Sequence, residues 1–129
     1  MNYLNVAGVV AGPRLDIGAM TVYSGHISLV RNTGFKGVVR SSDRQPVIFF
    51  VPESDPIATP PTRTWLEIGL RRIRSMGNPT MTYFGAYDEQ VDVAPDPRGG
   101  DHRWLQVSLQ IPLTSVEEIE LNYRVTVQA

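Results

Sequence analysis

The clearest structural signal lies in residues 118–127, EIELNYRVTV, close to the C-terminal end of the chain. Successive side chains of an extended strand point to opposite faces, and here apolar and polar residues alternate without interruption. The pattern predicts a β-strand with one face buried in a core and the other face on water. The predicted buried face consists of Ile119, Leu121, Tyr123, Val125 and Val127.

A second strand of the same kind precedes it at residues 104–111. Pro112 is expected to end this strand, because proline has no N–H to donate to a ladder. The short connection over 113–116 suggests that the two strands form an antiparallel pair. The predicted buried face of this second strand consists of Leu105, Val107, Leu109 and Ile111.

Weaker signals predict further strands earlier in the chain. The dipeptide Ser24-Gly25 has the composition of a turn between two of them. Val47–Val51 is a continuous apolar run between Pro46 and Pro52, which predicts a strand buried on both faces. Glycines in the N-terminal segment 8–12 are typical of bulges or of a close approach between backbones. The further predicted strands cover residues 15–23, 26–30, 35–40, 47–51, 80–87 and 90–93.

The segment 64–74 fits two interpretations. A short helix would place Leu66, Leu70 and Ile73 on one face, but Gly69 would cost about 1 kcal/mol in its middle. A strand would place Leu66, Ile68 and Leu70 on one face, opposite arginine and glutamate side chains. We favour the strand and keep the helix as the alternative.

About eight short strands with glycine and proline punctuation predict an all-β fold with at most one short helix. The expected architecture is an antiparallel β-sandwich, with a jelly roll as its more specific form. The 129 residues fit a single domain, 1–129.

Composition excludes several classes of protein. The chain has no cysteine, which excludes disulfides, cysteine zinc sites and thiol nucleophiles. Its net charge of -1 provides no basic excess for nucleic-acid binding. No apolar run approaches the ~18 residues of a membrane span, and the N-terminal residues lack the pattern of a signal peptide. We therefore expect synthesis in the cytoplasm, with a virus particle as one destination, and no nucleic-acid or membrane partner.

The predicted loop 92–102 and the residues after it form the main candidate binding region. Asp92, Asp96 and Asp101 supply oxygen ligands of the type that calcium takes, although their spacing matches no known calcium loop. Asp, Gly and Pro are also ordinary turn residues, so no cofactor is the primary expectation. Trp104 falls on the polar side of its strand, which suits either a glycan or a subunit contact. The candidate ligand-binding residues are Asp96, Asp101, His102, Arg103 and Trp104.

No catalytic constellation is evident. His26 and His102 lie in separate segments without the HxH spacing of a metal barrel, so ordinary surface or hydrogen-bonded histidines are expected. Ser24 or Ser28 beside His26 has no nucleophile-elbow context. Glu118 and Glu120 share one strand face, whereas a glycosidase needs two carboxylates across a cleft. We expect no enzyme, with an enzyme on the same scaffold as the third alternative.

These observations favour a non-enzymatic, homo-oligomeric structural protein, such as a viral or phage capsid, tail or fibre component. Eleven of the twelve basic residues are arginine, which is enriched in subunit interfaces. The segment 52–63 carries four of the ten prolines, as arms that pack on a neighbouring subunit often do. The alternative is a carbohydrate-binding, lectin-like module that uses the 92–102 loop and Trp104. The expected partners are copies of the same chain and, for the alternative, glycans.

Overall fold

The computed structural model describes residues 3–37, 44–51, 61–75, 87–95, 103–112 and 116–129. These residues form eight strands and no helix, which confirms the all-β prediction. The strand interpretation of segment 64–74 is also confirmed. The strands are β1 (Leu4–Ala11), β2 (Leu15–Ile17), β3 (Met20–Arg31), β4 (Arg44–Phe50), β5 (Arg63–Ser75), β6 (Tyr87–Pro95), β7 (Arg103–Pro112) and β8 (Val116–Gln128).

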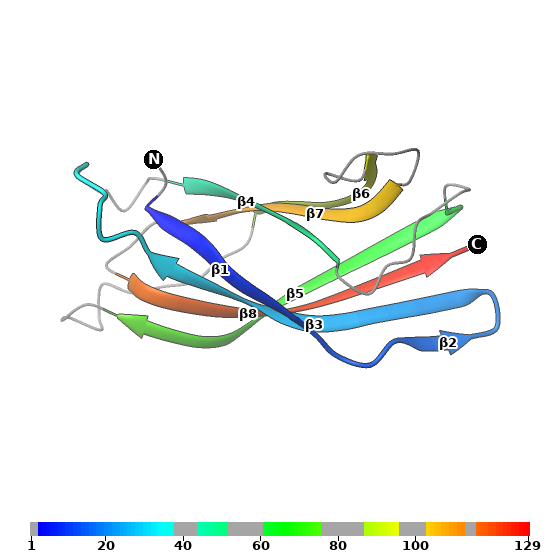
Figure 1. Cartoon of the computed structure of the whole chain (residues 1–129). Coiled ribbons are helices and arrows are strands. Elements are labelled where there is room, and N and C mark those ends of the chain that lie inside the picture. The colour runs from blue at the N-terminus through cyan, green and yellow to red at the C-terminus, as the bar shows by residue number, and fades with distance from the viewer. Residues whose placement is uncertain (1–2, 38–43, 52–60, 76–86, 96–102, 113–115) are drawn as a thin grey trace.

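The strands form two antiparallel sheets that lie one above the other (Figure 1). The large sheet has the order β1-β3-β8-β5, and β2 extends it by pairing with the first residues of β3. The small sheet has the order β4-β7-β6. The fold is thus consistent with a β-sandwich.

Three predictions about strand ends and pairing were wrong. β7 and β8 do not pair with each other, because β7 is the centre of the small sheet and β8 lies inside the large one. Ser24-Gly25 is not a turn but the middle of β3. The turn lies at Gly18-Ala19, where Gly18 has a φ of 59°, a backbone conformation that favours glycine. Residues 35–37 are not in a strand, and the rest of the predicted strand 35–40 lies outside the described residues.

The core fills the space between the sheets. The buried faces predicted for β7 and β8 are confirmed, with Val127 only half-buried. The Phe49 and Tyr123 rings, one from each sheet, have their centroids 5.2 Å apart. The buried apolar residues are Tyr3, Leu4, Tyr23, Ile27, Leu29, Val47, Phe49, Val51, Leu105, Val107, Leu109, Ile111, Ile119, Leu121, Tyr123 and Val125.

β4 is buried on one face only, so the prediction of burial on both faces was wrong. Val47 and Phe49 point into the core, whereas Ile48 is 53% exposed. β4 is also an edge strand, which explains how Pro46 can lie within it.

Gln45 joins β4 to the start of β1 across the interior. Its side-chain oxygen accepts from the Leu4 N–H at 2.9 Å, and its side-chain nitrogen donates to the Leu4 carbonyl at 2.6 Å. Gln45 is the single buried polar side chain among the described residues. The two bonds satisfy both backbone groups of Leu4 and give the Gln45 side-chain amide two partners. Burial of these polar groups therefore costs little free energy.

Two bulges correct the strand phase at the edges of the large sheet. Arg71 is the extra residue in β5, between the pairs Leu70–Leu121 and Arg72–Glu120. It allows Leu66 and Ile73 to pack on the same core although they are seven residues apart. Ala7 is the extra residue in β1, next to Gly8, as the glycine pattern predicted.

Candidate functional site

The outer face of the large sheet is the face turned away from the small sheet. It carries several ion pairs and several exposed apolar side chains of the described structure. Cross-strand partners share a face, so the register gives its composition row by row. Tyr23, Tyr123 and Val125 are buried, which places the residues that alternate with them on the outer face.

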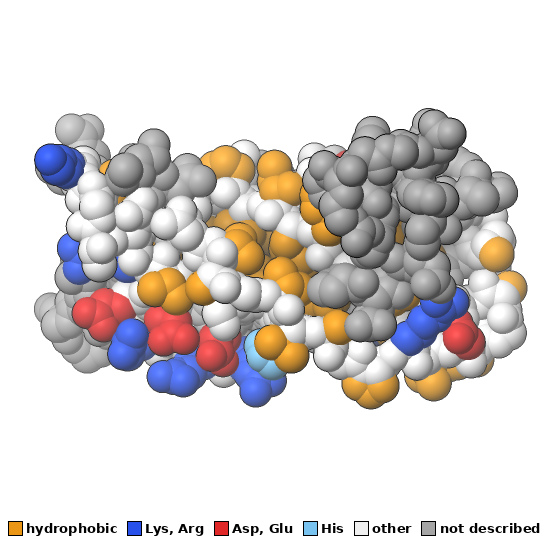
Figure 2. Space-filling model, in the orientation of Figure 1, with side chains coloured by type: hydrophobic (Ala, Val, Ile, Leu, Met, Phe, Trp, Pro, Cys, Tyr) orange, Lys and Arg blue, Asp and Glu red, His pale blue; other side chains and the backbone are white. Residues whose placement is uncertain are grey.

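One end of this face is charged, and we call it the charged end. Arg71 Nε lies 3.3 Å from Glu120 Oε2, and Arg74 contacts both Glu117 and Glu118 at 3.4 Å. Arg72 is the cross-strand partner of Glu120. Figure 2 shows these alternating red and blue side chains along the lower left of the molecule.

The opposite end of the face carries exposed apolar side chains at both of its edges, and we call it the apolar end. One row runs Leu15–Val22–Thr126–Trp65 across four strands, and the next row runs Ile17–Met20–Gln128–Arg63, so it is apolar on β2 and β3 and polar on β8 and β5. Leu15 is 54% exposed, Ile17 59% and Trp65 42%. Orange side chains at the lower right of Figure 2, below β2, belong to this end of the molecule.

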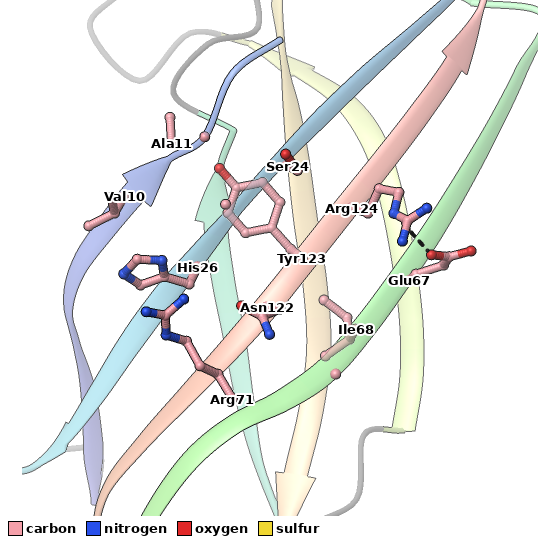
Figure 3. Close-up of a pocket in the computed structure, with 13 residues that line it drawn as sticks. Val10, Ala11, Ser24, His26, Glu67, Ile68, Arg71, Asn122, Tyr123 and Arg124 are labelled. Atoms are coloured by element: carbon pink, nitrogen blue, oxygen red, sulfur yellow. Dashed lines mark ion pairs between the residues drawn. The ribbon is translucent and has the colours of Figure 1, made fainter. Parts of the chain in front are cut away.

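Between the two ends lies a groove with a volume of about 650 Å³. His26 and Asn122 are cross-strand partners in it, and Gly69, next in the row, leaves open space above the sheet because no atom lies within 4 Å of its missing side chain. In Figure 3, Arg71 extends from β5 across Asn122 toward His26. The Glu67–Arg124 ion pair, at 3.2 Å, closes the opposite side of the groove.

The groove offers hydrogen-bond donors and acceptors to a ligand. His26, Arg71 and Asn122 can donate, and Ser24 and Glu67 can accept. Within the described residues, no group of three or more His, Asp or Glu side chains gathers as metal ligands. No helix in the described part of the chain has the length and apolarity of a membrane span.

The predicted binding region 92–104 is only partly described. Asp96, Asp101 and His102 lie outside the described residues. Asp92 is exposed in β6 opposite Gln106, so the predicted loop begins too early, because residues 92–95 belong to a strand. Arg103 and Trp104 open β7, at register positions opposite Pro95 and Ala94. The glycan and calcium predictions for this region remain predictions.

Sequence reasoning missed both the groove and the apolar end. His26 was expected to be an ordinary surface or hydrogen-bonded histidine, and neither Leu15 nor Trp65 was predicted as a site residue. The alternation within β3 indicated part of this face. His26, Ser28 and Val30 alternate with the buried Ile27 and Leu29, so they lie together on the opposite face of the strand. The rows that assemble the face depend on strand order, which periodicity does not contain.

Comparisons with protein-family models, with curated proteins and with solved structures found no match to this chain.

Proposed function

We propose that this chain is a non-enzymatic β-sandwich that functions by assembling with copies of itself, as viral and phage capsid, tail or fibre proteins do. The observation that carries the proposal is the apolar end of the outer face. Isolated apolar side chains are common on protein surfaces, but clusters of them mark interaction sites. Leu15, Ile17 and Trp65 belong to adjacent rows of one face, each more than 40% exposed.

The strand order supports the jelly-roll form of the sandwich. β3 pairs with β8 and β4 pairs with β7, so these pairs are nested in the sequence, as in a long hairpin folded over on itself. Jelly rolls occur in viral capsid and lectin domains.

The test is the mass of the purified protein in light scattering across micromolar concentrations. We expect a symmetric oligomer, since closed point-group symmetry is the rule for homo-oligomers. A monomeric mass throughout this range would overturn the proposal.

The second candidate function is carbohydrate binding. The groove favours it, because it is open, combines apolar surface with several hydrogen-bonding side chains, and is of a size that suits a small saccharide. The predicted residues Trp104 and Asp92 lie near the adjoining ends of β6 and β7, which leaves two regions to test.

A glycan array with and without calcium distinguishes these possibilities. If region 92–104 binds the glycan, Trp104→Ala abolishes the signal while Trp65→Ala, on the other sheet, preserves it. If the groove binds it, Asn122→Ala is the variant that loses the signal. A blank array with the wild-type protein contradicts the carbohydrate candidate.

A further inference from the structure

The apolar end places its largest exposed side chains at opposite edges of the large sheet. Leu15 and Trp65 stand in one row but are separated by β3 and β8. Three strand spacings of about 4.8 Å put them roughly 14 Å apart, so they cannot contact each other within one chain. A partner that covers both must present apolar groups at two matching places.

A second copy of this chain meets that requirement. We propose that the outer face of the large sheet is a self-complementary interface, on which two copies pack about a two-fold axis that runs along the strands between β3 and β8. This inference rests on the proposed assembly function and specifies its partner and surface. The rotation places β2 of one copy over β5 of the other and keeps each row opposite itself. Leu15 therefore covers the partner's Trp65, Ile17 lies over the partner's Arg63, and each contact occurs twice.

The charges of the face are compatible with this arrangement. The charged side chains of the face lie on β5 and β8, while the matching positions on β3 hold Ser24, His26, Ser28 and Val30. The same rotation brings β8 over the partner's β3, so the arginine and glutamates of β8 face four positions that hold no arginine, lysine, aspartate or glutamate. They enter the interface already paired, as Glu67–Arg124 and Arg71–Glu120 show, which lowers the cost of removing them from water.

Other axes are less favourable. A two-fold axis along β8 would place the β8 glutamates of the two copies over each other, and like charges in an interface are destabilising. A two-fold axis across the strands would place the charged end over the apolar end. Of these three axes, the one between β3 and β8 brings the apolar ends together, with Leu15 over the partner's Trp65, without placing the β8 glutamates over each other.

The size of the face is sufficient for a stable dimer. Four strands about 4.8 Å apart, with β8 at 13 residues of about 3.3 Å each, cover roughly 800 Å². That is about the area per partner of a standard protein–protein interface. Twisted sheets pack face to face with their strands within about 30° of each other, which this axis permits.

The experiment uses two variants that should fail alone and succeed together. Trp65→Arg and Leu15→Glu each place a charge against an apolar group at both symmetric contacts. We expect each to raise the dimer dissociation constant by roughly 30-fold or more, because the apolar contact between Leu15 and Trp65 is lost at both symmetric positions. In a mixture of the two, the new arginine faces the new glutamate at one contact, and the native Leu15–Trp65 contact forms at the other. A mixed dimer should therefore appear in light scattering and native mass spectrometry.

Rescue by mixing cannot arise inside one chain, because the two positions lie at opposite edges of the sheet. Ile48→Glu is the matched control. Ile48 lies on the small sheet and is about as exposed as Leu15, so this variant should leave the mass of the oligomer unchanged. Thermal melting verifies that the variants fold. If the wild type is monomeric, the proposed function fails together with this inference. If the wild type is oligomeric and both variants keep its mass, or no mixed dimer forms, the assembly function stands and this interface is overturned.

Discussion

The two faces of the large sheet use the same strands in different ways. Along β8 the inner positions 119, 121, 123 and 125 are all buried and all apolar. The outer positions between them run from glutamates at one end, through Asn122 and Arg124, to Thr126 beside the exposed Trp65. The inner face packs against the core and excludes water, so each of these four inner positions holds a buried apolar residue. The outer face has no such uniform requirement, and its division into a charged and an apolar end therefore carries information about interactions.

The largest expected effect comes from breaking the inner face. Leu121 is fully buried, so Leu121→Asp places an unpaired charge in the core at a cost of several kcal/mol. That approaches the whole stability of a typical domain, about 5–15 kcal/mol. We expect insoluble or unfolded protein, measured by solubility, circular dichroism and thermal melting.

Glu120→Lys is the matched change one residue away on the outer face. It replaces the Arg71 ion pair by repulsion with Arg71 and Arg72, so we expect a loss of about 1 kcal/mol and an intact fold. Equal tolerance at positions 120 and 121 would mean that the two faces are not distinguished as described.

The second prediction tests how the interior accepts a polar group. Gln45→Leu removes both partners of the Leu4 backbone and leaves a buried N–H and carbonyl unsatisfied. We expect a loss of about 2–3 kcal/mol in urea unfolding. Gln110→Leu, on the half-buried outer side of β7, is the control and should change stability by less than about 0.5 kcal/mol. A neutral Gln45→Leu would show that the two hydrogen bonds contribute little.

The third prediction compares two glycines of the large sheet that face opposite sides. A side chain on Gly25 would collide with the Val10 carbonyl and come within 2.6 Å of the Tyr123 hydroxyl, so Gly25→Ala should cost about 1–3 kcal/mol. Gly69 has open space on the outer face, and Gly69→Ala should raise stability by about 0.4–1 kcal/mol. Melting temperatures of the two variants should move in opposite directions, and a shift of the same sign in both would refute the assignment of faces.

The smallest effect concerns the β2–β3 hairpin. The Thr21 hydroxyl donates to Asp16 at 2.9 Å and, with Arg14 as a lesser contributor, holds the pKa of Asp16 below its usual 3.8. A lowered pKa stabilises the fold above that usual value, and this contribution is lost as the pH falls through the folded pKa. Thr21→Val should raise the pKa of Asp16 toward 3.8 in an NMR titration, and Arg14→Gln should raise it less. An unchanged titration in Thr21→Val would exclude this hydrogen bond in solution.

The sequence was sufficient to predict faces but not neighbours. Alternation in β7 and β8 reported burial directly, so Leu105 and Leu121 were placed correctly in the core. The same alternation is silent about which strands pair, and β7 and β8 belong to different sheets although they are adjacent in the chain. Gly25 misled the turn prediction because glycine also serves where two backbones and a tyrosine crowd one position.

The candidate site was less predictable than the core because its composition depends on which strands are neighbours. The apolar end takes Leu15 from β2 and Trp65 from β5, which become members of one row only through the registers of β3 and β8. The Val47–Val51 run shows the reverse error, since apolar composition suggested burial at Ile48, which is exposed on an edge strand. Exposure of an apolar residue depends on what covers the sheet, and composition does not report this.

The bulge at Arg71 also bears on how this fold can change in length during evolution. A residue lost from a regular strand reverses the inside and outside of everything beyond it. Arg71 is already an unpaired extra residue, so its deletion would leave Leu70 opposite Leu121 and Arg72 opposite Glu120, with every core side chain still directed inward. Ala7 provides the same freedom in β1. Both edges of the large sheet therefore contain a position where the chain can lose a single residue without reversing the direction of its core side chains, whereas β8, which is regular between Glu118 and Gln128, contains none in that stretch.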